Sequence, residues 1–118
     1  MAKILFVFES SPYSSGNAQD AFDFSMAAPG YGHESTVCFS GDGLEHLRAD
    51  GWPKPFNQKS SVKRIKALSL YDVENCFAAI PSSEHECYQS AADSLGVVLI
   101  EADAMAQLID THDFVIYF

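Results

Sequence analysis

Three cysteines, Cys38, Cys76 and Cys87, are the most reactive side chains of this 118-residue sequence. A thiol that acts as a nucleophile must be exposed as a thiolate, and a nearby cation or helix N-terminus must lower its pKa. Cys76 lies in the middle of the strand-like segment LYDVENCFAAI, beside Glu74 and Asn75, where the sequence offers neither access nor a cation. Cys38 and Cys76 are kept as candidate thiols, but a structural role is the simpler interpretation of all three cysteines.

The spacing of the cysteines and histidines bears on metals and on the redox environment. An odd number of cysteines without a C-x-x-C pair indicates reduced thiols, as in a cytoplasm. The four histidines are scattered and offer no pair at the spacing of metal ligands, so we expect no metal site. Cys87 falls on a helical stripe with Tyr88, Ala91 and Leu95, and we expect it in the core.

Composition indicates one globular domain that comprises residues 1–118. The sequence is 47% hydrophobic and 19% charged, which excludes a disordered chain. No apolar run approaches the roughly 20 residues of a membrane helix. The N-terminal run KILFVF lacks a small-residue cleavage site and favours a buried strand over a signal peptide. We therefore expect a cytoplasmic protein.

Charge is distributed unevenly along the chain. Residues 1–47 contain one base and six acids, residues 48–66 contain six bases and one acid, and residues 67–118 contain nine acids and no Lys or Arg. The basic segment, which includes Arg48, Lys63 and Arg64, predicts a cationic patch on an anionic body. Such a patch suits an acidic protein surface, whereas the rest of the molecule would repel a nucleic acid. A solvated helix face explains the same residues equally well.

Periodicity predicts strands that alternate with helices. We expect strands at residues 3–8, 34–40, 72–80, 97–102 and 113–118, and helices at residues 17–28, 42–47, 62–70, 83–95 and 103–110. Parallel neighbours need crossover connections, so this alternation predicts a three-layer α/β/α sandwich: a five-stranded parallel sheet with helices on both faces.

Ligands of such sheets gather at the carboxyl ends of the strands. The first loop there, ESSPYSSGNAQ, offers serines, a glycine and a helix start, which is the chemistry of a phosphate site. A flavodoxin-like protein that binds FMN is therefore one alternative, although a plain helix cap explains the serines as well. A phospho-acceptor domain is excluded, because the third strand ends in Ala79-Ile80 and residues 67–118 contain no lysine.

Four segments together resemble the TusC/DsrF branch of the DsrE-like sulfur-relay proteins: FVFESSPYSSG, STVCFSGDGLEHL, LYDVENC and EADAMAQLIDTHDFVIYF. The resemblance covers nearly the whole chain. It implies a five-stranded parallel sheet with helices on both faces and a place in a heterohexamer with TusB/TusD-like or DsrE/DsrH-like sister subunits. Such an assembly passes persulfide sulfur between carrier proteins, either for 2-thiolation of the tRNA wobble uridine or for sulfur oxidation.

The resemblance also implies where a sulfur-bearing cysteine would lie, namely at the end of the third strand and chiefly in a sister subunit. In this chain Ala79 occupies that position, and IPSSEHEC replaces the arginine-glycine pair that usually follows. Cys76 precedes Ala79 by three residues, so it would lie about 10 Å down the strand and on the opposite face. The resemblance therefore implies a non-catalytic subunit. The alternative is a sulfurtransferase that uses its own thiol.

We expect no cofactor for the leading interpretation, and we expect protein partners. Phe24 falls off the apolar stripe of its helix, and an exposed phenylalanine there suits a subunit contact. Phe24, Arg48, Lys63 and Arg64 are the candidate interface residues.

Overall fold

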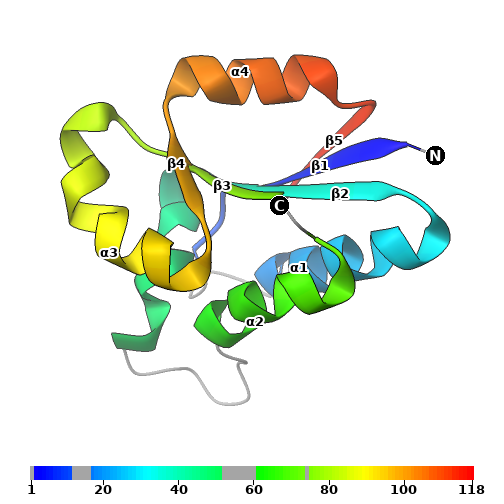
Figure 1. Ribbon diagram of the computed structural model, residues 1–118, viewed down its shortest axis with the longest axis horizontal. Coiled ribbons are helices and arrows are strands. Elements are labelled where there is room, and N and C mark those ends of the chain that lie inside the picture. Colours follow the sequence, from blue (N-terminus) through cyan, green and yellow to red (C-terminus); the bar gives the residue numbers. More distant parts are fainter. Residues whose placement is uncertain (1, 12–16, 52–60, 74) are drawn as a thin grey trace.

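The computed structural model describes residues 2–11, 17–51, 61–73 and 75–118 (Figure 1). Its five strands are β1 (Lys3–Phe8), β2 (Glu34–Phe39), β3 (Asn75–Ala79), β4 (Val98–Ile100) and β5 (Phe114–Tyr117). Its α-helices are α1 (Asn17–Ala27), α2 (Ser61–Ala67), α3 (His85–Leu95) and α4 (Ala102–Thr111). Four 3₁₀ helices complete the described elements: η1 (Ala28–Tyr31), η2 (Gly41–Gly51), η3 (Leu68–Tyr71) and η4 (Ser82–Glu84).

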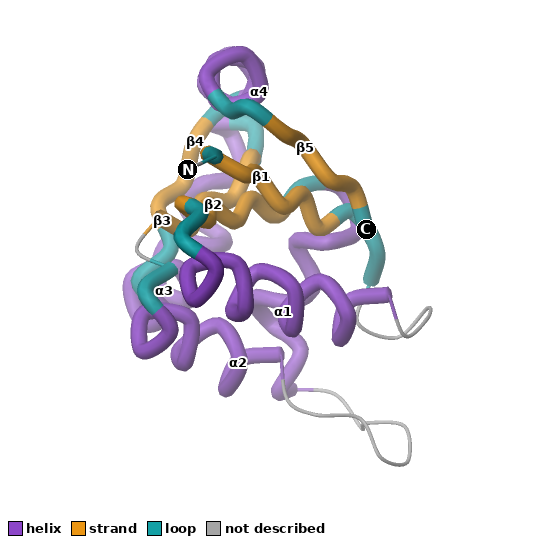
Figure 2. The backbone as a smooth tube through the Cα atoms, turned by 90° about the vertical axis from the view of Figure 1, so that its right-hand side faces the viewer, coloured by secondary structure: helices purple, strands orange, loops and turns teal. Residues whose placement is uncertain are grey.

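All pairs of neighbouring strands are parallel, in the order β4-β3-β2-β1-β5. Helix α4 covers one face of the sheet, and α1, α2 and α3 lie on the other (Figures 1 and 2). We call these the α4 face and the α1 face. The predicted three-layer α/β/α sandwich with five parallel strands is confirmed.

Strand β1 shows why the sheet needs cover on both sides. Its side chains alternate, so Leu5 and Val7 pack in the cluster beneath α4, whereas Phe6 and Phe8 pack in the larger cluster beneath α1, α2 and α3. All four side chains are buried. After Lys3 the strand is apolar at every position, and such a strand is stable only between two layers, which is typical of parallel sheets.

The third strand begins later than the sequence pattern predicts. Asp72 has a left-handed backbone (φ 66°) and ends η3, and its N–H donates to the carbonyl oxygens of Leu68 and Ser69. Val73 N donates to the carbonyl oxygen of Leu68 (3.1 Å). These hydrogen bonds satisfy the last carbonyl groups of η3. Because the N–H groups of residues 72 and 73 are used in this way, β3 begins only after them.

Gly43 brings η2 against the carboxyl end of β1. A Cβ atom at this position would overlap the carbonyl oxygen of Phe8, so only glycine fits. The predicted helix at residues 42–47 is thus part of a longer 3₁₀ helix that packs closely on the sheet. Its side chains Leu47 and His46 are buried.

Candidate functional site

Ala79 is the last residue of β3, at the carboxyl end of the sheet. It lies opposite Ile100 of β4 in the strand register. Its side chain is half-buried and packs on the α4 face against the cluster of Leu5, Val7 and Cys38. A methyl group at this position can take no part in sulfur exchange.

Cys76 lies on the α1 face, among the side chains of the larger core cluster. It is 8% exposed. Burial raises the pKa of its thiol far above the ordinary range, and the neighbouring Cys38 adds to this effect. A buried thiol that stays protonated is a poor nucleophile, so Cys76 acts here as a small apolar side chain.

Cys38 lies on the α4 face and is fully buried. Burial raises the pKa of its thiol to about 11, although a hydrogen bond from the backbone of Ala79 lowers it in part. The sulfur also approaches the carbonyl oxygen of Phe39 (3.9 Å). The thiol therefore lies within hydrogen-bond reach of the backbone of Ala79, the residue predicted to occupy the sulfur-bearing position, but has no access to solvent.

Cys87 is exposed, so its predicted place in the core is wrong. The side of α3 that faces the protein is centred on Ala92, which is fully buried, with Tyr88 and Leu95 packed against the core. Cys87 falls at the margin of that side. It lines an open hollow of about 450 Å³ together with side chains of η2, α2 and α3, namely Leu47, Val62, Ser90, Ala91, Ser94 and Leu95.

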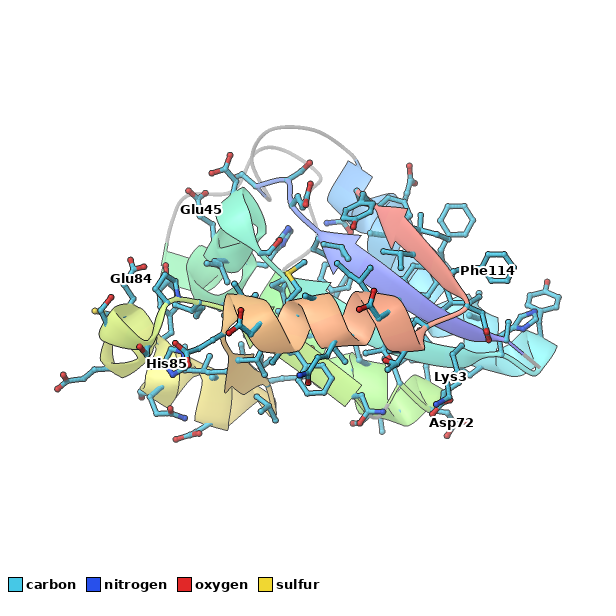
Figure 3. All side chains as sticks on the ribbon, turned by 90° about the horizontal axis from the view of Figure 1, so that it is seen from above. Lys3, Glu45, Asp72, Glu84, His85 and Phe114 are labelled. Carbon is cyan, nitrogen blue, oxygen red and sulfur yellow. The ribbon has the colours of Figure 1, made fainter. Side chains whose placement is uncertain are left out.

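Acidic residues follow the strands at the carboxyl end of the sheet. Glu9 follows β1, Asp42 and Glu45 follow β2, and Glu84 and Glu101 follow β3 and β4. Figure 3 shows Glu45 and Glu84 at this end, opposite the end that holds Lys3, Asp72 and Phe114. Negative charge disfavours a thiolate, because like charges raise the pKa of a thiol. The described residues that directly follow these four strands include no Lys or Arg.

Two hydrogen bonds at this end fix polar side chains, one to the backbone and one to another side chain. His85 donates through Nε2 to the carbonyl oxygen of Ile80 (2.9 Å). The hydroxyl of Ser11 donates to the carboxylate of Glu45 (2.8 Å). These contacts hold the first turn of α3 and the start of η2 against the ends of β3 and β1.

His46 is a buried histidine that the sequence analysis did not single out. Its ring is fully buried, contacts the rings of Phe8, Phe22 and Phe39, and donates through Nε2 to the carbonyl oxygen of Ser10 (2.9 Å). Burial lowers its pKa to about 4, against smaller opposing effects of Ser10 and Glu45. The neutral ring thus fastens η2 to the loop after β1.

The structure places Phe24 and Arg64, two of the candidate interface residues, on different sides of α1. Phe24 is 59% exposed and stacks on Phe118 of the C-terminal segment, with ring centroids 6.2 Å apart. Arg64 binds Gln19 (2.8 Å) and Asp23 on a different side of α1, with its guanidinium 5.3 Å from the ring centroid of Phe22.

Lys63 is exposed on α2, and the side chain of Arg48 lies outside the described part. The interface role of these residues stays a prediction.

Three predictions from the sequence concern a phosphate site, a metal site and a membrane-spanning helix. The phosphate-like SSG of the first loop lies at residues 14–16, outside the described residues. Among the residues that are described, no group of three or more His, Cys, Asp or Glu side chains is arranged to hold a metal ion. No helix in the described ranges is both long and apolar enough to cross a membrane.

Comparisons with known proteins identify the family. The sequence profile of the DsrE/DsrF-like family matches residues 2–118. A TusC homolog of Aliivibrio fischeri is 27% identical over 110 residues, which cover 90% of this chain and 86% of the relative. Protein TusC of Klebsiella pneumoniae is 26% identical over 119 residues and all of both chains. A TusC homolog of Vibrio parahaemolyticus is 30% identical over 82 residues, 70% of each chain.

Two solved structures share the fold. The ychN protein of E. coli superposes with a TM-score of 0.68 at 17% identity over the whole of both chains. A conserved protein of unknown function from Bacteroides thetaiotaomicron superposes with a TM-score of 0.70 at 8% identity, over 98% of this chain and 94% of that one. The topology, the matched profile and the TusC relatives agree, and the chain belongs to the DsrE/DsrF-like family, in its TusC/DsrF branch.

Proposed function

We propose that this chain is a non-catalytic subunit of a sulfur-relay complex, present as a single domain in the cytoplasm. The observation that carries the proposal is the side chain at the end of β3, where Ala79 offers a methyl group in place of a thiol. Membership of the TusC/DsrF branch supports the sulfur-relay context. The TusC names of the relatives favour 2-thiolation of the tRNA wobble uridine over sulfur oxidation.

The chemistry of persulfide transfer explains why the side chain at position 79 matters. In persulfide transfer, a thiolate attacks the outer sulfur of a carrier persulfide, the S–S bond breaks, and the donor cysteine leaves as a thiolate. The acceptor must therefore be exposed and deprotonated. Cys38 and Cys76 are buried and have raised pKa values, so neither meets this requirement.

The acidic carboxyl end of the sheet supports the same conclusion. A persulfide-bearing cysteine needs positive charge or helix N–H groups to stabilise its anion. Glu45 and Glu84 provide the opposite charge at the carboxyl end of the sheet (Figure 3), the end at which Ala79 closes β3. In the proposed complex the reactive cysteine belongs to a sister subunit, and this chain contributes to assembly.

A sulfurtransferase that uses its own thiol is the second candidate, because Cys87 is exposed. The thiol lies on α3 rather than at the end of a strand, and the described side chains that line its hollow include no Lys or Arg. Incubation of the purified chain with glutathione persulfide, followed by intact mass spectrometry, tests this candidate. A gain of one sulfur that disappears in the Cys87→Ser variant would establish it.

Co-expression tests the leading proposal. The chain is produced together with DsrE-type and DsrH-type chains from the same genome, with an affinity tag on one sister chain only. The proposal predicts that the untagged chain co-purifies in fixed stoichiometry and that the complex survives size-exclusion chromatography. A chain that elutes as a monomer and binds neither sister would contradict it.

A further inference from the structure

Strand β5 leaves an aromatic surface uncovered at one edge of the sheet. It pairs with β1 on one side only, and its four residues are all apolar. Phe114 and Ile116 lie on the α1 face and are 59% and 41% exposed, while Tyr117 on the α4 face is 52% exposed. Among the described elements, helix α1 lies over β1 and β2 on this face and leaves β5 open (Figure 2).

Phe24 extends this surface from the helix layer. Its ring stacks on Phe118, which in turn stacks on Phe6 with centroids 6.4 Å apart. The strand register places Ile4 beside Phe114 and Phe6 beside Ile116. One continuous apolar surface therefore runs from α1 across the end of the chain to the edge of the sheet. We call Phe24, Phe114, Ile116 and Phe118 the edge patch.

An open edge of this kind needs a cover. Proteins block exposed edge strands with lysine, proline, bulges or a covering element, because unpaired backbone groups attract other strands. The sequence of β5, FVIY, contains neither lysine nor proline. Large exposed apolar patches, aromatic ones above all, mark contact surfaces of proteins.

Charge around the edge patch selects the kind of partner. Asp20 precedes Phe24 by one helical turn, and Asp113 precedes Phe114; both are exposed. Lys3, which begins β1, is 4.0 Å from the carboxylate of Glu34, and Arg64 binds Asp23 on α1. Two copies of a chain with a net charge of −9 would bring acidic rims together, which disfavours a homodimer. A partner with an apolar centre and a basic rim fits instead.

We propose that the edge patch is the surface through which this chain binds a different protein subunit, whose contact surface is apolar at its centre and basic at its rim. This inference rests on the proposed function for the identity of the partner, a sister chain of the sulfur-relay complex. Three other exposed apolar side chains suit this role less. Tyr31, Leu70 and Tyr71 lie on the 3₁₀ helices η1 and η3, which offer no strand edge.

Variants of matched exposure test the assignment. Phe24→Glu and Phe114→Glu each place an acid in the edge patch, and Val98→Glu places one on the opposite edge strand, where Val98 is 56% exposed. Binding of each variant to the purified sister chains is measured by biolayer interferometry. The two patch variants should bind at least about ten times more weakly, whereas Val98→Glu should bind as wild type does. Higher salt should slow association of the wild-type chain.

A second measurement does not depend on how the variants fold. Hydrogen–deuterium exchange of the wild-type chain, alone and in the complex, should show protection at residues 114–118 and in α1, and none at β4. Protection confined to β4 or α3 would overturn the assignment, as would equal binding of all three variants. Sedimentation velocity that shows a stable homodimer, lost in Phe114→Glu, would overturn the choice of partner. If the wild-type chain binds neither sister, the proposed function itself fails.

Discussion

Cys76 and Ala79 lie on the same strand but on opposite faces of the sheet, with Cys76 in the core beneath α1, α2 and α3 and Ala79 beneath α4. They are three positions apart, and side chains of a strand alternate, so no small shift of the backbone can exchange their places. The cysteine of β3 is therefore not a displaced catalytic residue. The DsrE/DsrF-like fold is present, and the position that we propose as the equivalent of the sulfur-bearing cysteine holds the methyl group of Ala79.

The three cysteines should differ in reactivity. Under native conditions at pH 8, a thiol reagent such as dithionitrobenzoate should modify Cys87 rapidly, because only this thiol is exposed. Cys38 and Cys76 should react only on unfolding, since burial keeps their thiols protonated; the pKa of Cys38 is raised to about 11. The Cys87→Ser variant should lose the fast phase and keep the two slow ones. A fast phase that persists in this variant would show that a strand cysteine is accessible.

Gly43 should tolerate no side chain. The Gly43→Ala substitution places a methyl group on the carbonyl oxygen of Phe8, and since both partners are backbone atoms, η2 must move. We expect a loss of about 2 to 4 kcal/mol in the free energy of unfolding, measured by urea titration. Gly30→Ala is the matched control, because nothing lies within 4 Å of its added Cβ atom. Equal stability of the two variants would show that η2 does not pack on β1 as described.

Arg64 should stabilise the packing of α2 on α1. Its side chain is 12% exposed, donates to Gln19 and Asp23, and lies over the ring of Phe22. The Arg64→Ala variant should lose about 1 to 2 kcal/mol of unfolding free energy. Lys66→Ala removes the same charge from an exposed position of the same helix and should cost less than about 0.5 kcal/mol. Similar losses in both variants would mean that charge alone, and not these contacts, decides the effect.

His46 should make stability depend on pH. Its pKa is lowered to about 4 in the folded state, below about 6.5 for an unfolded histidine, so the unfolded chain binds the proton first as the pH falls. The contribution of the neutral ring is complete above pH 6.5 and is lost between about pH 6.5 and pH 4. By pH 4.5 the wild type should lose about 2 to 3 kcal/mol relative to the His46→Gln variant. Parallel pH profiles of the two proteins would show that the ring is not buried in its neutral form.

Much of the fold follows from local patterns in the sequence. The runs ILFVF and FVIY are apolar at every position, which indicates strands buried in a parallel sheet or lying at its edge. The separation of Cys76 and Ala79 already indicates opposite faces, because the period of a strand is two. The exposure of Phe24 follows in the same way from its angle on the helix, away from Ala21, Phe22 and Ser25, which are buried.

Other features depend on contacts between distant segments. Cys87 is exposed because α3 turns Ala92 rather than Cys87 toward the core. The apolar stripe of α3 does not by itself fix how the helix is rotated about its axis when it packs at the edge of the sheet. His46 is buried because Gly43 allows η2 to approach β1; the glycines of GDG are the sequence signal that could have indicated this approach. The partners of Arg64 lie 38 to 45 residues away, beyond any local pattern.

The most direct test of the account follows sulfur in the assembled complex. The co-expressed complex is charged with glutathione persulfide, separated into its chains under denaturing, non-reducing conditions, and each chain is weighed by mass spectrometry. The account predicts a gain of one sulfur on a sister chain and an unchanged mass for this chain. A sulfur adduct on any of the three cysteines of this chain, the exposed Cys87 included, would contradict it.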